Sequence, residues 1–338
     1  MTATTDSTQL ATMTAIVQHR YGTADQWRVG ERPIPTIAAD EVLVEVHAAG
    51  LDRGTKHLMV GEPYAMRLAF GLRGPKNPVP GLDLAGRVVA VGEAVTRFHV
   101  GDDVFGIGKG SFAQFAAAKE SKLALMPANL RYEQAAAVAV SGLTAIQAVC
   151  DVGRVEAGQH VLITGASGGV GTFAVQIAKA MGAIVTGVCS SAKVDLVRSL
   201  GADRAIDYLH EDITAGNTRY DLIVDMVSTS SLAQLRSMLT DHGTLVVGGA
   251  EDMGRLLGIG RQLRAVALSP FVGQRLTMLV SKEHFSGLER LRELIERGEV
   301  TPVVEQTFAL ADAPEAMRQF EAGVVRGKLV IIPPSVRP

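Results

Sequence analysis

The sequence predicts an α/β protein built from a partly open β barrel and a doubly wound parallel sheet. Short β-rich runs separated by Gly and Pro fill the chain from about residue 13 to 126. After about residue 130 the pattern changes to apolar strands that alternate with helices, which is typical of βαβ units. From about residue 301 the chain returns to β texture.

The first domain is predicted from short apolar runs bounded by Gly and Pro, which end strands and form turns. Their spacing favours a barrel or sandwich over a βαβ fold. The predicted strands are 15–17, 42–46, 86–91 and 103–105.

The second domain is predicted from strands that are apolar throughout, as expected when helices cover both faces of a sheet. Helices are expected at 172–181, after a glycine-rich turn, and at 193–200. The predicted strands, in chain order, are 160–164, 183–188, 205–207, 221–225 and 243–248.

The end of the chain carries two further β runs, at 303–304 and 329–332. We expect this part to rejoin the first domain, which makes that domain discontinuous. The predicted boundaries are 13–130 with 301–338 for the β domain, and 131–300 for the doubly wound domain.

Composition is that of a globular protein with two domains of ordinary size. The 338 residues are 47% hydrophobic with a net charge of −2, which argues against a nucleic-acid partner. Only Cys150 and Cys189 are present, so we expect no disulfides and a reducing, cytoplasmic location. Residues 1–12 lack the apolar core of a signal peptide. The apolar stretch 135–150 is too short to span a bilayer, so we expect a buried helix and no membrane partner.

A glycine-rich turn from Gly165 to Gly171 lies directly between a predicted strand and a predicted helix. Gly168 lets the backbone approach a pyrophosphate, Gly171 lets helix and strand pack closely, and the helix N-terminus offers free N–H groups to the anion. Ala166 makes the G-x-G-x-x-G fingerprint imperfect, and a tight turn without a ligand is the alternative. The residues expected to bind a dinucleotide here are Ser167, Gly168, Gly169 and Val170.

The end of the second strand of this domain indicates which dinucleotide binds. NAD enzymes usually place an acidic residue there for the ribose hydroxyls. Here the strand runs into Ser190, Ser191 and Lys193, with no carboxylate before Asp195. Two hydroxyls and an ammonium suit a 2′-phosphate, and Tyr208 offers a further hydrogen bond, so we expect NADPH. The alternative is that Lys193 only solvates the start of its helix.

Five motifs stand in a specific order along nearly all of residues 13–334. They are residues 80–86, residues 101–106, the glycine turn, residues 200–203 with 207–208, and residues 327–330. In this order they resemble the medium-chain dehydrogenase/reductase superfamily, and within it the zinc-free quinone oxidoreductase and enone reductase branch.

The resemblance implies a GroES-like β domain and a Rossmann domain, an active site in the cleft between them, and a homodimer. It places Thr144 beside the nicotinamide and Lys328 in the closing motif, where a salt bridge between domains would explain the lysine equally well. Val227, Gly248 and Gly249 follow the fourth and fifth parallel strands, whose carboxyl ends face the ligand crevice.

The chain lacks the residues with which zinc enzymes of this superfamily hold their metal. No Cys precedes Cys150, so the first zinc thiolate and the four-Cys structural lobe are missing. Catalytic zinc needs three protein ligands and an open position. Because His47, His57 and His99 have no matching spacing, we expect no metal.

Without a Lewis acid, oxidation of an unactivated alcohol is difficult. A quinone or a conjugated enone instead accepts hydride and leaves an oxyanion that hydrogen bonds stabilise. We therefore expect an NADPH-dependent reductase of a quinone or an α,β-unsaturated carbonyl. Two other functions fit: a zinc-free alcohol or carbonyl oxidoreductase, and an NADPH-binding protein without turnover.

Three polar residues are the expected catalytic groups. Asp52 stands where the family commonly has Asn near the nicotinamide ribose. One hypothesis gives Asp52 a raised pKa and the role of proton donor; the alternative is a hydrogen bond to the ribose. His57 and Tyr64 are the next polar groups expected at the cleft, although either could be an ordinary surface residue.

Two segments, 61–79 and 255–276, combine Arg with apolar residues and look longer than in the smallest family members. We expect them to form a roof over the substrate or a dimer contact.

Overall fold

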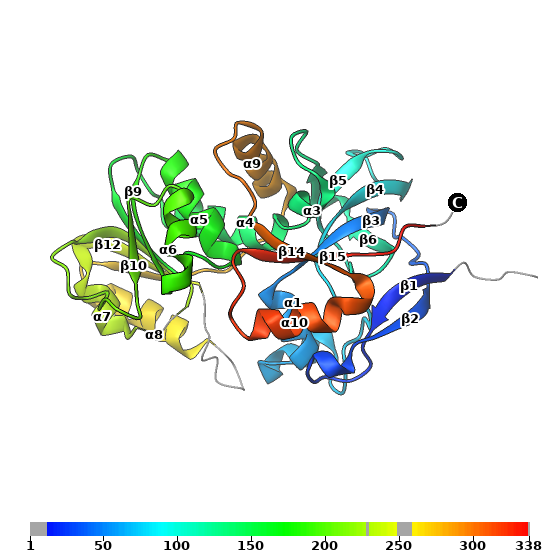
Figure 1. Cartoon of the computed structure of the whole chain (residues 1–338), viewed down its shortest axis with the longest axis horizontal. Coiled ribbons are helices and arrows are strands. Elements are labelled where there is room, and N and C mark those ends of the chain that lie inside the picture. The colour runs from blue at the N-terminus through cyan, green and yellow to red at the C-terminus, as the bar shows by residue number, and fades with distance from the viewer. Residues whose placement is uncertain (1–11, 228–229, 249–258, 337–338) are drawn as a thin grey trace, which may run out of the picture.

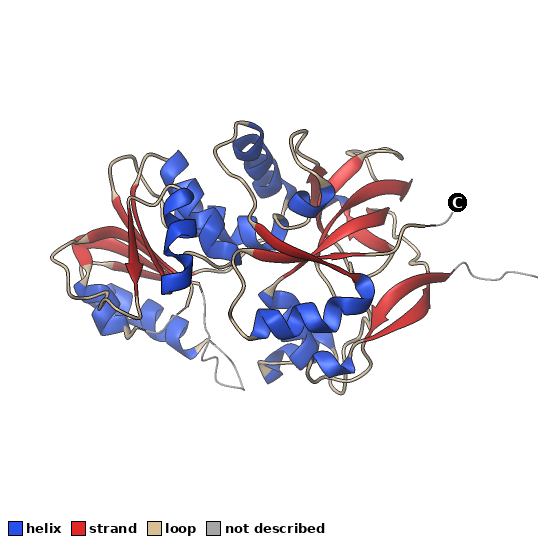
Figure 2. Ribbon diagram, in the orientation of Figure 1, coloured by secondary structure: helices blue, strands red, loops and turns tan. Residues whose placement is uncertain are grey.

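The computed structural model describes residues 12–227, 230–248 and 259–336. Figure 1 shows an elongated molecule whose two halves each contain a large β sheet. Figure 2 shows that one half is richer in strands, whereas helices flank the sheet of the other half.

Short strands build the β-rich half of the molecule. They are β1 (Thr12–Val17), β2 (Arg28–Pro33), β3 (Glu41–Leu51), β4 (Asp83–Val91), β5 (Asp103–Ile107), β6 (Phe115–Lys119), β7 (Leu123–Leu125), β14 (Val304–Ala309) and β15 (Lys328–Ile332). The main sheet has the order β14-β15-β3-β4-β5-β7, with β6 also paired to β3, and β1 and β2 form a separate pair. β15 runs antiparallel to β3, so late strands complete a sheet that early strands began. The exact domain boundaries stay a prediction.

The core of this half contains the single tryptophan of the chain. Trp27 is buried, and its indole N–H donates to the side-chain oxygen of Gln18 at 2.8 Å. Its ring meets Phe112 edge-on at 5.6 Å between centroids, a favourable arrangement for two aromatic rings.

Parallel strands build the second half. They are β8 (His160–Thr164), β9 (Ile184–Cys189), β10 (Arg204–Asp207), β11 (Tyr220–Asp225), β12 (Leu239–Val247) and β13 (Arg275–Met278). Their order is β10-β9-β8-β11-β12-β13, and every neighbouring pair is parallel. This is the Rossmann order, in which a ligand crevice opens at the carboxyl edge between the first and fourth strands, here β8 and β11. The predicted fold class is confirmed.

Helices cover both faces of this sheet. They are α5 (Gly169–Ala180), α6 (Val194–Ser199), α7 (Leu232–Ser237) and α8 (Gly260–Leu268). Val161 and Ile163 of β8 share one core cluster with Phe173 of α5. Leu162, between them, lies in another cluster with Leu235 of α7. Alternate residues therefore face opposite layers of helices, which explains strands that are apolar throughout.

The remaining helices join or flank the two sheets. They are α1 (Arg53–Val60), α2 (Arg67–Phe70), α3 (Tyr132–Ala135), α4 (Ala139–Ile146), the π-helical η4 (Gln147–Val152), α9 (Phe285–Glu296), α10 (Ala313–Glu321), and the 3-10 turns η1 (Ala24–Gln26), η2 (Tyr64–Met66), η3 (Glu120–Lys122), η5 (Ser191–Lys193), η6 (Ser269–Phe271) and η7 (Leu310–Asp312). The apolar stretch 135–150 is buried and helical for most of its length. Within the described ranges, no helix is long and apolar enough to cross a membrane.

The structure corrects one expectation about the segment 255–276. Its last two residues, Arg275 and Leu276, belong to β13 at the edge of the parallel sheet, and Leu276 is buried against β12. These two residues therefore belong to the sheet and not to a roof over the substrate, while a dimer contact of the segment stays a prediction. Residues 255–258 lie outside the described residues.

Candidate functional site

The glycine turn between β8 and α5 contains glycines of two kinds. Gly165 has a left-handed backbone with φ of +66°, and a Cβ there would lie 2.3 Å from the Val227 side chain. A Cβ on Gly171 would lie 2.1 Å from the Gly165 carbonyl oxygen. Gly168 differs, because its φ is −85° and a Cβ would meet only that same oxygen, at 3.4 Å. The protein's own packing therefore does not require a glycine at 168, and the open space suits a ligand.

The N-terminus of α5 faces this open space without a cap. Its N-cap residue, Gly168, offers no side chain, so no side-chain hydrogen bond satisfies the first turn. The N–H groups of Gly169 and Val170 have no acceptor within the helix because they belong to its first turn. Together with the positive end of the helix dipole, they fit a phosphate of a dinucleotide.

The chain near Lys328 supports the turn from behind. The Gly327 N–H donates to the Ser167 carbonyl at 2.9 Å, and Gly168 and Gly327 form an isolated parallel bridge. Ser167 itself is buried. The predicted cofactor residues of the turn thus lie together, at the carboxyl edge of β8.

A hydrogen-bond network holds the neighbouring strand ends. The Thr164 hydroxyl donates to the buried Asp225 carboxylate at 2.8 Å and accepts from the Met226 N–H at 2.9 Å. Arg261 of α8 also donates to Asp225, at 2.8 Å. Sequence reasoning missed Asp225 and Arg261, although an acid at the end of an apolar strand was a usable signal.

Two predicted residues follow these strand ends. The Val227 side chain packs beside Gly165, and the Gly248 N–H donates to the Asp225 carbonyl at 3.0 Å. Both therefore lie at the same carboxyl edge as the glycine turn. Gly249 lies outside the described residues.

The residues expected to bind a 2′-phosphate gather at the end of β9. Ser190 is half-buried and Ser191 is exposed. The Lys193 ammonium donates to the Gly323 carbonyl at 3.0 Å and to the Val325 carbonyl at 2.8 Å. Burial lowers the pKa of Lys193.

Arg326, which sequence reasoning missed, adds a second cation here. Its charge contributes to the lowered pKa of Lys193, after burial and against the larger opposing effect of the Glu305 carboxylate, and the Arg326 side chain is exposed. Tyr208 is also present nearby, after β10, with 56% of its surface exposed.

A carboxylate also lies at this subsite. β10 pairs with β9 so that Asp207 stands opposite Cys189. A hydrogen bond from Ser191 lowers the pKa of Asp207, which is therefore ionised at neutral pH. No carboxylate lies close to Ser190 and Ser191 along the chain, but the pairing of β10 with β9 places Asp207 beside them.

Asp52 lies at the start of α1 and caps that helix. Its carboxylate accepts from the Thr55 N–H at 2.7 Å and from the Thr55 hydroxyl at 3.3 Å. Only 3% of Asp52 is exposed. Burial raises the pKa of Asp52, and the nearby charge of Lys328 partly opposes that rise.

Lys328 forms a buried ion pair with Asp83, a residue that sequence reasoning did not assign to the site. The ammonium lies 2.9 Å from the Asp83 carboxylate, and the two side chains are 2% and 0% exposed. Burial raises the pKa of Asp83 to about 7, with Lys328 opposing and Asp52 adding to the rise. Lys328 was expected to bind the cofactor, with a salt bridge between domains as the alternative. The ion pair with Asp83 joins β15 to β4 within the β half, and binding of the cofactor by Lys328 stays a prediction.

Thr144 and His57 bond to their own surroundings. The Thr144 hydroxyl donates to the Val140 carbonyl on the same helix at 2.7 Å. His57 is half-buried, and its Nδ1 lies 3.0 Å from the Glu62 carbonyl oxygen, which can only accept, so Nδ1 carries the proton. Burial lowers the pKa of His57, which leaves Nε2 free of a proton at neutral pH.

Tyr64 lies on an exposed part of the segment 61–79. Its side chain is 39% exposed, and the Arg67 guanidinium stacks over its ring at 4.5 Å. Leu68 and Leu72 are 78% and 68% exposed. No hydrogen bond among the described residues links Tyr64 to Asp52 or His57, so the three predicted catalytic groups do not form one hydrogen-bonded unit.

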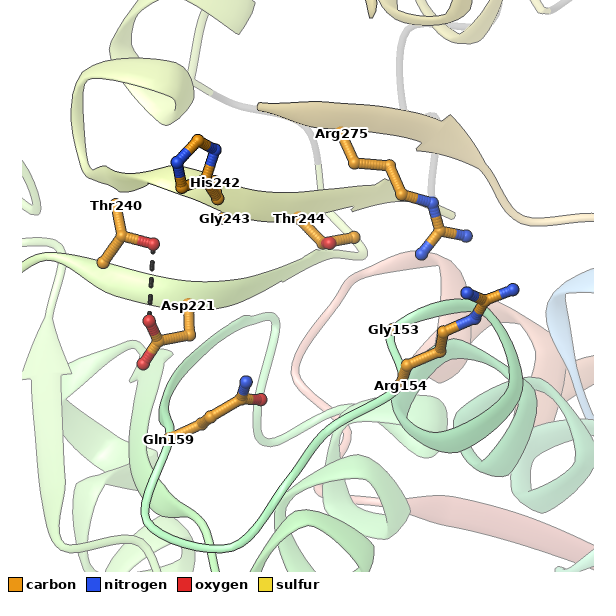
Figure 3. A pocket seen from close by; sticks show the side chains of 9 residues that line it. All are labelled: Gly153, Arg154, Gln159, Asp221, Thr240, His242, Gly243, Thr244 and Arg275. Carbon is orange, nitrogen blue, oxygen red and sulfur yellow. Dashed lines mark hydrogen bonds between the residues drawn. The ribbon is translucent and has the colours of Figure 1, made fainter. Parts of the chain in front are cut away.

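A pocket of about 260 Å³ opens at the other edge of the parallel sheet (Figure 3). Asp221 lines it near the start of β11, and its carboxylate accepts from the His160 N–H and the Thr240 hydroxyl. Arg154 and Arg275 line the other end. Because this edge carries the amino ends of the strands, the pocket is separate from the cofactor crevice.

Comparison with known proteins places the chain in a family. Residues 38–128 match the alcohol dehydrogenase GroES-like domain, and residues 200–331 match the zinc-binding dehydrogenase family. The NAD(P)H oxidoreductase RTN4IP1 of Danio rerio, named as mitochondrial, is 33% identical over 94% of this chain and 91% of its own. The trans-enoyl reductase pgmF of Aspergillus terreus is 32% identical over 88% of this chain and 89% of its own. The solved quinone oxidoreductase of Coxiella burnetii has a TM-score of 0.83 and 26% identity, covering 97% of this chain and 100% of its own.

The name of the second matched family raises the question of zinc. No group of three or more His, Cys, Asp or Glu side chains in the described part of the chain could hold a metal ion. Zinc sites in proteins use three or four such ligands. The residues described here therefore do not fit a zinc ion.

The Rossmann sheet with its open glycine turn fits a nicotinamide dinucleotide, and the relatives cover nearly the whole length of the chain. The resemblance predicted from the motifs is confirmed. The chain belongs to the medium-chain dehydrogenase/reductase superfamily, as an oxidoreductase related to the quinone oxidoreductases and using a nicotinamide cofactor.

Proposed function

We propose that the protein is a zinc-independent, NADPH-dependent reductase of a quinone or an α,β-unsaturated carbonyl compound. The observation that carries the proposal is the open glycine cradle at the uncapped N-terminus of α5, where a dinucleotide phosphate fits. The relatives named as quinone oxidoreductase and trans-enoyl reductase support this substrate class.

NADPH is favoured over NADH by the cations at the end of β9. Lys193 and Arg326 supply positive charge, and Ser190, Ser191 and Tyr208 supply hydroxyls. The two carbonyls that now accept from Lys193 would give way to a 2′-phosphate, since the ammonium bonds more strongly to an ionised acceptor than to a neutral carbonyl. Asp207 opposes this preference.

A bound nicotinamide dinucleotide supplies the hydride in such a reaction. The chain holds the phosphates at α5 and provides a proton for the product. We propose Asp52 as the proton source, since burial raises its pKa and so favours the protonated carboxyl. Thr55 orients that carboxyl through both of its oxygen atoms.

Oxidation of NADPH and of NADH in the presence of quinones, enones and aldehydes tests this function. We expect turnover of quinones or enones with NADPH, unchanged by a metal chelator. Turnover of aldehydes alone would favour a carbonyl oxidoreductase. Tight NADPH binding with no turnover of any acceptor would favour a binding protein and contradict the proposal.

We also propose a homodimer in the cytoplasm. β13 pairs only with β12 among the described strands, so its outer edge can accept a strand from a second copy. The cytoplasmic location rests on the two unpaired cysteines, Cys150 and Cys189, one of them buried.

A further inference from the structure

The start of β15 lies directly against the glycine turn. Beyond the bond from Gly327 to the Ser167 carbonyl, the aliphatic stem of Lys328 fills the space beside Gly169. A Cβ on Gly169 would lie 3.1 Å from Cδ of Lys328 and 3.0 Å from the Ser141 hydroxyl. The Lys328 side chain therefore lines one side of the space beside Gly169, the first residue of α5.

The other end of the Lys328 side chain is held by Asp83. One oxygen of that carboxylate pairs with the ammonium at 2.9 Å, and the other accepts from the Val140 N–H at 2.7 Å. Val140 is in the first turn of α4, the helix that carries Ser141 and Thr144. Asp83 thus joins three segments: β4, the start of β15 under the glycine turn, and the start of α4.

The surroundings leave Asp83 and Lys328 little freedom. Gly50 of β3 packs so closely that a Cβ there would lie 3.0 Å from the Asp83 carboxylate and 2.3 Å from the Ala136 carbonyl oxygen. A buried ion pair contributes little net stability, because desolvation of both charges offsets their attraction. What such a pair does supply is a fixed direction and distance between the parts that carry it.

We infer that Asp83 is a positioning residue for the cofactor site: through Lys328 and Val140 it sets the shape of the phosphate cradle at Gly169. This inference rests on the proposed binding of the cofactor at that turn. Asp83 does not touch the cofactor itself, since it is fully buried behind the lysine.

The same lysine also links Asp83 to Asp52. The groups that face one another here are Asp52 at the start of α1, Asp83 on β4 and Lys328 on β15, and the charge of Asp52 also acts on His57. The carboxylates of Asp52 and Asp83 thus share the Lys328 ammonium. On the helix that carries His57, the charges of Arg53 and Lys56 lower the pKa of that histidine. Without the charge of Asp83, Lys328 would compensate Asp52 alone, and the pKa of Asp52 would fall.

The variant Asp83→Asn tests the inference, because it keeps the shape of the side chain and removes its charge. We expect NADPH to bind about tenfold more weakly by calorimetry, as for the loss of one charged hydrogen bond. We expect KM for NADPH to rise by more than kcat falls, and the alkaline limb of the kcat profile, where Asp52 loses the proton that it donates, to move to lower pH. The matched control is Asp103→Asn, which removes the exposed ion pair between Arg87 and Asp103 and should change none of these quantities.

Unchanged NADPH affinity in folded Asp83→Asn would overturn the inference. If that variant does not fold, a double variant, Asp83→Asn with Lys328→Met, is used. It replaces the buried ion pair by a neutral pair of similar size. Weak NADPH binding by the folded double variant supports a positioning role, and wild-type affinity overturns it. Wild-type protein that binds neither NADPH nor NADH would overturn the proposed function, and this inference with it.

Discussion

At the scale of single residues, the cofactor preference depends on a balance between Lys193 and Asp207 at the end of β9. Lys193→Met should raise KM for NADPH about tenfold, as for the loss of a charged hydrogen bond worth about 1.5 kcal/mol, and should leave KM for NADH nearly unchanged. Asp207→Asn should lower KM for NADPH, because a like charge near the phosphate is removed. Steady-state kinetics with both cofactors measure the ratio of the KM for NADPH to the KM for NADH. Equal changes for NADPH and NADH would contradict a 2′-phosphate subsite.

The sequence predicted some residues of this subsite and missed others, because only some of them follow one another along the chain. Ser190, Ser191 and Lys193 directly follow a strand, so their place at the crevice can be predicted from local pattern. Asp207 arrives through the register between β10 and β9, and Arg326 through a distant loop. A single sequence holds no local signal for either contact.

For Asp52 too, the sequence predicted one part of its role and missed another. Its location near the cofactor site was a prediction from the resemblance, and burial does raise its pKa as the proton-donor hypothesis requires. Its two bonds to Thr55 make it a helix cap as well, which the order Asp52–Thr55 could have indicated. The sharing of Lys328 with Asp83 depends on the packing of three distant strands.

At the scale of elements, the glycine turn contains one glycine that packing requires, Gly171, and one that leaves room for a ligand, Gly168. Gly171→Ala should destabilise the protein by about 3 kcal/mol, because its Cβ would clash with the backbone at Gly165. Gly168→Ala should cost about 1 kcal/mol or less, since the backbone there suits any residue. Its methyl group should instead weaken NADPH binding. Urea unfolding and calorimetry on the two variants check this, and equal loss of stability in both would contradict the assignment.

Boundaries of elements were predicted less well than their existence. The helix after the glycine turn begins at Gly169, three residues before the predicted start, because glycines are poor helix formers and give no helical signal. The strands β2, β6, β7 and β13 were not predicted. β6 and β7 are short and rich in Ala, and β13 becomes a strand only through its pairing with β12.

At the scale of the whole molecule, the buried carboxylates should make stability depend on pH. The pKa of Asp83 is about 7 in the folded protein against 3.8 for an ordinary Asp, so the folded state holds a proton that the unfolded chain releases. Stability from this source is therefore greatest at low pH and decreases as the pH rises toward 7. The lowered pKa of His57 acts in the opposite sense.

The difference in the free energy of unfolding between the wild type and Asp83→Asn isolates the contribution of Asp83 to this pH dependence. We expect the stability advantage of the wild type, from urea unfolding, to shrink between about pH 4 and about pH 7. An advantage that grows over this range would mean that Lys328 keeps Asp83 ionised throughout, with a lowered pKa.

The pairing of β15 with β3 has a consequence for the order in which the protein can be built. Every strand of the parallel sheet lies between residues 160 and 278, so the ribosome can release that sheet as one continuous piece. The edge of β3 at Ala49 and Leu51 has to wait for Ile331 and Leu329, which are synthesised far later. Until then that edge presents unpaired N–H and C=O groups, which favour aggregation. Chaperones that shield nascent chains should therefore matter more for the β half than for the cofactor half.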